Sequence, residues 1–149
     1  SDYRHLDDST VRVSIYYLVH LVGDIHCPVH IRYPWYDSFA FKIYDKPYVL
    51  HKFWDAVPEL IHRWGYQDYR LQLDRCSKAE RRALAAGTPH EWADESAETC
   101  RVIYDWIKAG DDLSKHRSHD YMLRVQPLAE EQILKAGYRL ARILNELFG

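Results

Sequence analysis

Two short segments of the chain carry histidine and aspartate at spacings that suit metal binding. The first contains His20 and Asp24 and continues to His30, and the second contains His51 and Asp55. Residues four positions apart lie on the same face of a helix, so each His-x-x-x-Asp pair can point into one cavity. Imidazole and carboxylate are donors that suit zinc, and a site that keeps an open position for water is typical of catalysis. These five residues are therefore the candidate metal ligands.

The His-x-x-x-Asp spacing is a weak signal by itself. With nine His and fourteen Asp in 149 residues, about one such pair is expected by chance. The chain contains four. One of them, His116 with Asp120, lies in a polar stretch without helical apolar periodicity, where we expect a solvated loop, and His90, which pairs with Asp94, is given no role. The pairs His20/Asp24 and His51/Asp55 are embedded in apolar, aromatic-rich helical sequence. A buried His or Asp without a partner costs on the order of a few kcal/mol there, so these groups need one.

The composition indicates one ordinary domain covering residues 1–149, with 47% hydrophobic and 14% aromatic residues. Charges interrupt every apolar run before the roughly 20 residues that a membrane span needs, and no signal-peptide pattern is present, although a removed signal peptide is compatible with the sequence. The net charge of -2 argues against a broad electrostatic nucleic-acid footprint. A phosphate substrate would therefore depend on localised metal charge.

Three cysteines, Cys27, Cys76 and Cys100, are too few for a disulfide framework, and none belongs to a Cys-x-x-Cys arrangement. Two interpretations stay open. The thiols are reduced in a cytosolic protein, or one cysteine of an oxidised protein pairs with a segment outside these 149 residues.

The first ligand segment is predicted to lie at the end of a helix from about residue 9 to residue 27. Ser9 or Thr10 can cap its start, and apolar residues follow helical spacing at Val11, Ile15, Leu18 and Val22. Pro28 ends or kinks this helix, which would turn His30 toward a different ion from the ligands on the helix. The alternative is that His30 is an incidental surface residue. His26 is on a different helix face from the ligands, which favours a position at the surface or behind a ligand.

An aromatic segment at residues 31–48 separates the two ligand segments. Its partial alternation at Phe39, Phe41 and Ile43 favours a long loop or a short hairpin that could line a cleft. Aromatic rings in such a loop can stack on nucleic-acid bases or pack in the core, and both interpretations stay open for Tyr33, Trp35, Tyr36 and Phe39.

The remaining sequence is predicted to be helical. A second helix at residues 49–64 carries His51 and Asp55 and contains Pro58, while residues 66–76 are unassigned. Further helices are expected at residues 77–87, from a Ser77 to Glu80 capping box, at 90–108, with an aromatic core stripe, and at 127–148, starting with Pro127. The prediction is an all-α domain of about five helices.

Four segments carry a resemblance to a known family. They are His20-Leu-Val-Gly-Asp24 with Pro28-Val-His30, Leu50-His51-Lys-Phe-Trp54-Asp55, Trp92-Ala-Asp-Glu95-Ser96, and Ala136-Gly-Tyr-Arg-Leu-Ala141-Arg-Ile-Leu-Asn145. In order and approximate spacing they resemble motifs of the secreted zinc-dependent single-strand nucleases and 3'-nucleotidases of fungi, plants and protozoa. That family is all-helical and distantly related to bacterial zinc phospholipase C.

The resemblance implies a cluster of three zinc ions. It assigns His20 to one ion, Asp24 to a bridge between two, and His30, His51 and Asp55 to the third. The implied reaction uses a metal-activated water, with no side-chain nucleophile, to cleave single-stranded DNA or RNA into 5'-phosphorylated products or to remove a 3'-phosphate from a nucleotide. A secreted or vacuolar location is implied in the same way.

The chain also departs from the family pattern. The amino-terminal Trp that ligates metal in the family, and three further upstream ligands, have no counterpart here. We therefore expect a fragment, one of two chains, or a degenerate relative, and one zinc ion on this chain alone. An amino-terminal half would be the partner, and it could supply a disulfide partner for Cys100.

Smaller departures concern the substrate site. Cys27 stands where the family usually has Gln, Val49 stands where it usually has Asn, and a Gly-Gly-Asn segment between the two ligand motifs is absent. Substrate positioning is therefore less transferable than metal binding. Two alternatives stay open, a zinc phospholipase C-like hydrolase and a non-catalytic structural or interaction subunit that keeps the fold.

Overall fold

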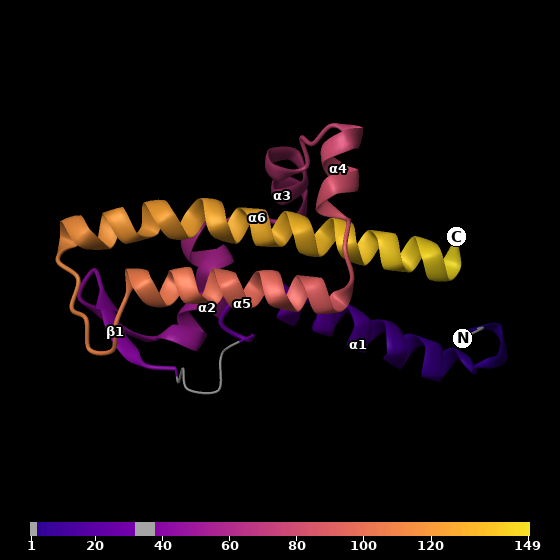
Figure 1. Ribbon diagram of the computed structural model, residues 1–149, viewed down its shortest axis with the longest axis horizontal. Helices are drawn as coiled ribbons and strands as arrows, with labels where there is room; N and C mark the ends of the chain where they lie inside the picture. The colour runs from indigo at the N-terminus through magenta and orange to yellow at the C-terminus, as the bar shows by residue number, and fades with distance from the viewer. Residues whose placement is uncertain (1–2, 32–37) are drawn as a thin grey trace.

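The computed structural model describes residues 3–31 and 38–149, and this part of the chain is mostly helical (Figure 1). A 3-10 helix at Tyr3–His5 is followed by α1 (Asp8–His26), β1 (Ala40–Ile43), β2 (Lys46–Val49), α2 (Leu50–Ile61), α3 (Tyr66–Leu73), α4 (Lys78–Leu84), α5 (Pro89–Trp106) and α6 (Lys115–Phe148). The expected all-α class is confirmed, with six α-helices in the described residues and a small hairpin in place of a loop.

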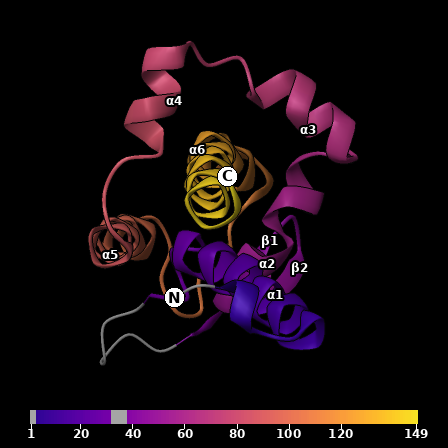
Figure 2. The ribbon, with the colours of Figure 1, turned by 90° about the vertical axis from the view of Figure 1, so that its right-hand side faces the viewer.

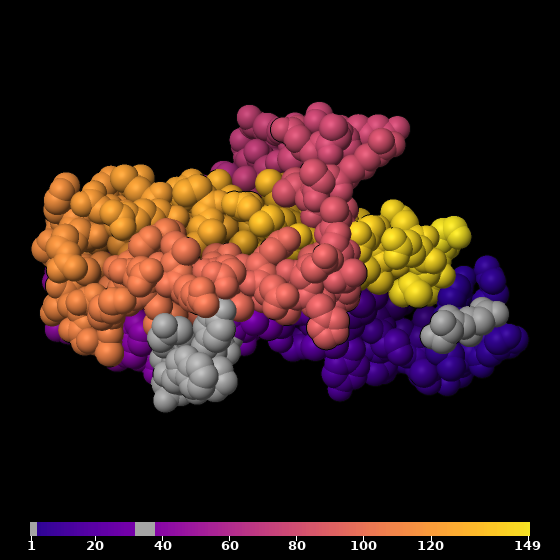
Figure 3. Space-filling view, viewed as in Figure 1, coloured from indigo at the N-terminus to yellow at the C-terminus, as the bar shows by residue number. Residues whose placement is uncertain are grey.

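The long helix α6 is the axis around which the other elements are arranged (Figure 2). Helices α1, α2 and α4 contact it, and α1 also contacts α5. Helices α3 and α4 bury no residue and project from the body as a separate lobe beside α6 (Figure 3). Helices α1 and α2, which carry the candidate ligands, therefore both pack against α6.

An aromatic core lies where the hairpin, α2, α5 and α6 meet. Phe53 of α2 packs edge-on against Phe41 of β1 at 5.5 Å and lies 5.8 Å from Tyr121 of α6. Aliphatic residues complete this cluster, among them Leu50, Val57, Ile103, Ile107 and Val125. Because buried residues recur at helical spacing along α2, His51 and Asp55 are left at the edge of the core.

Helix α1 begins one residue earlier than the sequence suggested, and its cap is Asp7 rather than Ser9 or Thr10. A carboxylate oxygen of Asp7 accepts a hydrogen bond from the Thr10 backbone N–H at 3.0 Å. Three hydrogen bonds to hydroxyl and amide donors lower the pKa of the Asp7 carboxyl, since they stabilise its charged form. The helix ends at His26, so Pro28 follows it and acts as a stop, as expected.

The segment before α2 forms the short hairpin that the alternation favoured. Phe41 and Ile43 point into the core, while Ala40 and Lys42 are exposed. The turn residues Tyr44 and Asp45 both have positive φ values, 49° and 63°, as a tight two-residue hairpin turn requires. Backbone hydrogen bonds from Lys42 to the segment before α6 attach the hairpin to the rest of the fold.

Helix α6 corrects two predictions. It begins at Lys115 and not at Pro127, because Ser114 caps it and buried residues recur at helical spacing through its first turns, at Ser118, Tyr121 and Val125. Pro127 lies inside the helix, where it removes one backbone hydrogen bond. The loop predicted around His116 is therefore wrong, although His116 and Asp120 are solvated, with side chains 86% and 49% exposed.

Other boundaries shift by smaller amounts. Helix α2 includes Pro58 but ends at Ile61, short of the expected residue 64. The unassigned segment after it contains α3. The Ser77 to Glu80 capping box is confirmed, and Gly87 after α4 has a φ of 88°, which favours glycine. Helix α5 is capped by Thr88, and of its predicted core stripe Trp92 and Ile103 are buried while Val102 is exposed.

Candidate metal centre

The five candidate ligands form one continuous row, which we call the ligand row. Asp24 at the end of α1 lies between His20, whose Nε2 is 3.2 Å from Oδ2, and His30, whose Nδ1 is 3.3 Å from Oδ1. The other ring nitrogen of His30 lies 2.9 Å from Oδ1 of Asp55 on α2. Oδ2 of Asp55 lies 3.5 Å from Nε2 of His51. The two segments predicted from sequence thus come together.

The turn after α1 places His30 at the centre of this row. Pro28 ends the helix, and the His30 amide donates to the Cys27 carbonyl at 2.9 Å, which closes a tight turn. The imidazole of His30 stacks on that of His51, with ring centroids 4.6 Å apart and an angle of 12° between planes. His51 itself is held by a hydrogen bond from its amide to the Ser38 hydroxyl. The expected turning of His30 away from the helix register is therefore present.

Both nitrogens of His30 face carboxylate oxygens. A neutral imidazole has one N–H and one lone pair, so it can donate a hydrogen bond to only one of two carboxylates. The other contact then sets a lone pair against a carboxylate oxygen unless a proton or a cation lies between them. This arrangement fits a cation-binding site, because histidine nitrogen and aspartate oxygen are donors that zinc accepts. The residues present therefore fit the metal that the resemblance implied.

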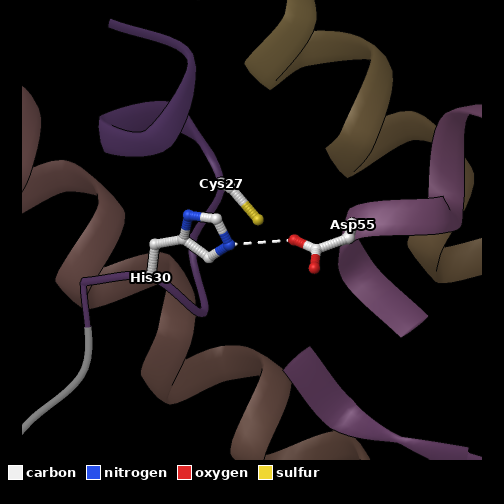
Figure 4. Close-up of side chains that lie close together, drawn as sticks. All are labelled: Cys27, His30 and Asp55. Carbon is white, nitrogen blue, oxygen red and sulfur yellow. Dashed lines mark hydrogen bonds and ion pairs between the residues drawn. The ribbon is translucent and has the colours of Figure 1, made fainter. Parts of the chain in front are cut away.

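Cys27 is a further donor that sequence reasoning did not assign. Its Sγ, a ring nitrogen of His30 and a carboxylate oxygen of Asp55 all lie within 4.8 Å of one another. In Figure 4 the sulfur points toward the gap that separates the other two side chains. Burial, with the nearby carboxylates of Asp55 and Asp24, raises the pKa of the Cys27 thiol to about 12. The sequence feature that could have identified Cys27 as a donor is its position one residue before Pro28, in the turn that carries His30.

A cavity of about 330 Å³ opens beside the row. Asp24, Cys27, His30 and Asp55 line its polar side. Val57, Ala129 and Ile133 contribute to the apolar side, so α6 forms one wall. Helices α1, α2 and α6 therefore enclose a space next to the candidate ligands.

A second polar cluster, the Arg139 network, lies behind α1 and was not predicted. Arg139 of α6 is 3% exposed and donates through Nη2 to both carboxylate oxygens of Glu95, at 3.0 and 2.7 Å. Its Nε donates to the Leu84 carbonyl at 3.1 Å, and its guanidinium lies 5.0 Å from the centre of the Trp92 ring. Trp92 and Glu95 belong to one of the two later segments that carried the resemblance and Arg139 belongs to the other, so those segments meet in the fold.

His26 belongs to this network. Of its two predicted positions, at the surface or behind a ligand, the surface position is wrong. The side chain is 3% exposed, with Nδ1 2.7 Å from the Val22 carbonyl and Nε2 2.9 Å from Nη1 of Arg139. Burial lowers the pKa of His26, and the Arg139 charge acts in the same direction. Because a carbonyl only accepts and a guanidinium only donates, Nδ1 carries the proton and Nε2 accepts.

Phe39 packs against Phe41 and Tyr104, which favours the core interpretation for it, whereas Tyr33, Trp35 and Tyr36 lie outside the described residues. No disulfide joins Cys27, Cys76 and Cys100, all of which are described. Within residues 3–31 and 38–149, every helix is too short or too polar to cross a membrane.

Comparison with known proteins identifies the family of this chain. The sequence matches the family described as S1/P1 nuclease over residues 2–149. It is also similar to Endonuclease 1 of Arabidopsis thaliana, with 26% identity over 156 aligned residues that cover 91% of this chain and 49% of the relative. The chain thus spans about half the length of this curated relative. Since the family match extends over nearly all of its residues, the chain belongs to the S1/P1 nuclease family.

Proposed function

We propose that this chain supplies His20, Asp24, His30, His51 and Asp55 to the zinc centre of a hydrolase that acts on phosphoesters of single-stranded nucleic acid or nucleotides. The family is zinc-dependent. The observation that carries the proposal is the position of His30 between the carboxylates of Asp24 and Asp55.

The two aspartates would have different roles. One oxygen of Asp24 faces His20 on α1 and the other faces Nδ1 of His30 in the turn, so Asp24 joins the two sides of the centre, and we assign it the bridge between two ions that the resemblance implied. The oxygens of Asp55 face His30 and His51, whose rings are stacked, so these three can share one ion. Bound zinc would polarise a phosphoryl oxygen and lower the pKa of a bound water. The side chains of the chain would hold and orient that centre beside the cavity.

We further propose that hydrolysis needs an amino-terminal segment in addition to these residues. The side chain of His20 is 67% exposed, so its outer side has room for further ligands. The same face of α1 continues into Tyr16 and Tyr17, which are 66% and 63% exposed, and apolar residues so exposed favour a packing partner. A segment packed on this face would lie beside His20 and Asp24. The half-length match to the relative supports the same proposal.

The test compares residues 1–149 with a version extended at its amino terminus by the segment encoded upstream. Each protein is supplied with zinc and assayed on single-stranded DNA, 3'-AMP and phosphatidylcholine. We expect the extended protein to hydrolyse the first two substrates and residues 1–149 to be at least about 1000-fold slower, since a cluster that lacks ligands loses most of its transition-state stabilisation.

Two outcomes would overturn the proposal. Turnover of phosphatidylcholine alone would identify a phospholipase C-like hydrolase. Absence of turnover on all three substrates by a folded, zinc-loaded, extended protein would identify a structural or interaction subunit. Secretion is likewise proposed from the family, whose members are typically secreted, and is tested by locating the extended protein in the culture medium or the cell.

A further inference from the structure

We infer that Cys27 is a direct ligand of the metal ion held by His30, His51 and Asp55, so that this ion has a thiolate in its coordination shell. The inference rests on the proposed function, because it concerns the same centre. It adds a donor that the resemblance does not supply, since the family usually has Gln at this position.

The geometry brings Cys27 to the correct side of the site. Its Sγ lies within 4.8 Å of a ring nitrogen of His30 and of a carboxylate oxygen of Asp55. Nε2 of His30 and Oδ1 of Asp55 are 2.9 Å from each other. Figure 4 shows the sulfur directed at the gap between the ring and the carboxylate. Donors around a tetrahedral zinc ion lie about 3.3–3.8 Å apart, as zinc-sulfur and zinc-nitrogen bonds of about 2.3 and 2.0 Å require. A rotamer adjustment of about 1 Å therefore brings the three donors into coordination range.

The backbone supports this placement. Cys27 is the residue that follows α1, and its amide donates to the Gly23 and Asp24 carbonyls. The His30 amide returns a hydrogen bond to the Cys27 carbonyl at 2.9 Å. The two side chains therefore leave one closed turn, anchored by the buried Pro28 and Val29, and both reach Asp55 on α2.

His51 completes a set of four donors. It stacks on His30, and its Nε2 lies 3.5 Å from the second oxygen of Asp55. Two imidazoles, one carboxylate and one thiolate satisfy the tetrahedral preference of zinc. Such a set is closed to water, which is typical of a structural rather than a catalytic ion. The inference thus assigns an anchoring role to this ion and leaves water activation to the part of the centre around His20 and Asp24.

Coordination requires loss of the thiol proton. The Cys27 S–H bond breaks, the sulfur forms a bond to the ion, and the proton passes to the buffer, so metal binding releases protons. The soft thiolate also changes the optical spectrum of a transition metal at this position, because charge transfer from sulfur to the metal absorbs in the near ultraviolet. This signal is independent of any hydrolysis.

The experiment is a Co²⁺ titration of residues 1–149, followed by absorption spectroscopy, for the native chain, Cys27→Ser and Cys76→Ser. We expect the sulfur-to-cobalt band in the native chain and in Cys76→Ser, and its loss in Cys27→Ser with retained helical circular dichroism. Because even residues that only orient ligands change metal affinity by about 10- to 100-fold, we expect Cys27→Ser to weaken Zn²⁺ binding at least about tenfold.

The native chain alone also tests the inference, in case Cys27→Ser fails to fold. Cobalt binding without the sulfur band would overturn the role of Cys27 and leave the proposed zinc hydrolase intact. Persistence of the band in folded Cys27→Ser, or its loss in Cys76→Ser, would overturn it as well. A sulfur band in a chain whose extended version hydrolyses no phosphoester would support Cys27 as a ligand and contradict the proposed function.

Discussion

Two histidine-containing polar clusters flank the carboxyl end of α1, and they differ in how their hydrogen bonds are satisfied. In the Arg139 network, His26 lies between one acceptor, the Val22 carbonyl, and one donor, the Arg139 guanidinium. In the ligand row, His30 lies between two acceptors, Asp24 and Asp55. A neutral imidazole matches the first setting but not the second. The comparison teaches that a neutral histidine satisfies the first cluster, whereas the second is satisfied only when a further proton or a cation lies between His30 and one of the carboxylates.

The two clusters also differ in burial, since the Arg139 network is more buried than the ligand row. Arg139 and His26 are each 3% exposed, while the side chains of Asp24, His51 and Asp55 are 38% exposed. Removing the partner of a buried polar group lowers the stability of the fold strongly, whereas water can replace the lost hydrogen bond of an exposed group. Changes in the Arg139 network should therefore affect folding, and changes in the ligand row should affect metal binding.

The largest effect on folding is expected for Arg139→Met. This change removes the donors to Glu95, to the Leu84 carbonyl and to Nε2 of His26 at one time. Breaking a buried, hydrogen-bonded charge pair costs about 3–5 kcal/mol, and the partial exposure of Glu95 favours the lower end, about 3 kcal/mol. Urea unfolding of the zinc-free protein measures the loss. In Arg124→Met, an exposed position on the same helix, the free energy of unfolding should change by less than about 0.5 kcal/mol. Similar losses in both variants would contradict the account.

A smaller effect is expected for His26→Ala. The substitution leaves Nη1 of Arg139 without its acceptor and opens space under α1, which should lower the free energy of unfolding by about 2 kcal/mol. The matched control is His20→Ala on the same helix, where the side chain is mostly exposed. In the absence of metal this control should change unfolding by less than about 0.5 kcal/mol. If His20→Ala were the more destabilising of the two in zinc-free urea titrations, His20 rather than His26 would be the histidine that stabilises the fold.

The smallest folding effect is expected for Ser96→Ala. The buried Ser96 hydroxyl donates to the Ile25 carbonyl, and this bond ties the end of α1 to α5. Its loss leaves a carbonyl near the helix end without a partner and should cost about 1 kcal/mol. Ser14→Ala, at an exposed position of α1, serves as the control in the same unfolding experiment. An unchanged stability in Ser96→Ala would mean that this bond does not hold α1 in place.

The ligand row was predictable from the sequence because its signal is local. Each His-x-x-x-Asp pair is a helical repeat, and the apolar residues around it show which helix it belongs to. The Arg139 network gave no such signal, since Arg139 and His26 are 113 positions apart. Only the tertiary packing of α1 against α6 brings them together. Cys27 was missed because its role depends on where the turn after α1 directs its side chain.

The fold was predictable to a similar degree. Capping boxes and apolar periodicity located α4, α5 and most of α1 and α2. The start of α6 was missed because its first turns bury only Ser118 and Tyr121 among many polar residues, while Pro127 is typical of a helix start and here lies inside a helix. Tertiary contacts on one narrow face outweighed the local sequence there.

The most direct test that the ligand row binds zinc is the zinc content of residues 1–149 after dialysis. It is measured for the native chain, for Asp55→Ala and for Asp120→Ala. Asp120 is a matched control, because it forms a further His-x-x-x-Asp pair, with His116 at 3.4 Å, on an exposed face of α6. We expect one zinc ion per native chain and per Asp120→Ala chain, and its loss in Asp55→Ala with unchanged helical circular dichroism. Equal zinc content in Asp55→Ala and the native chain would contradict the account.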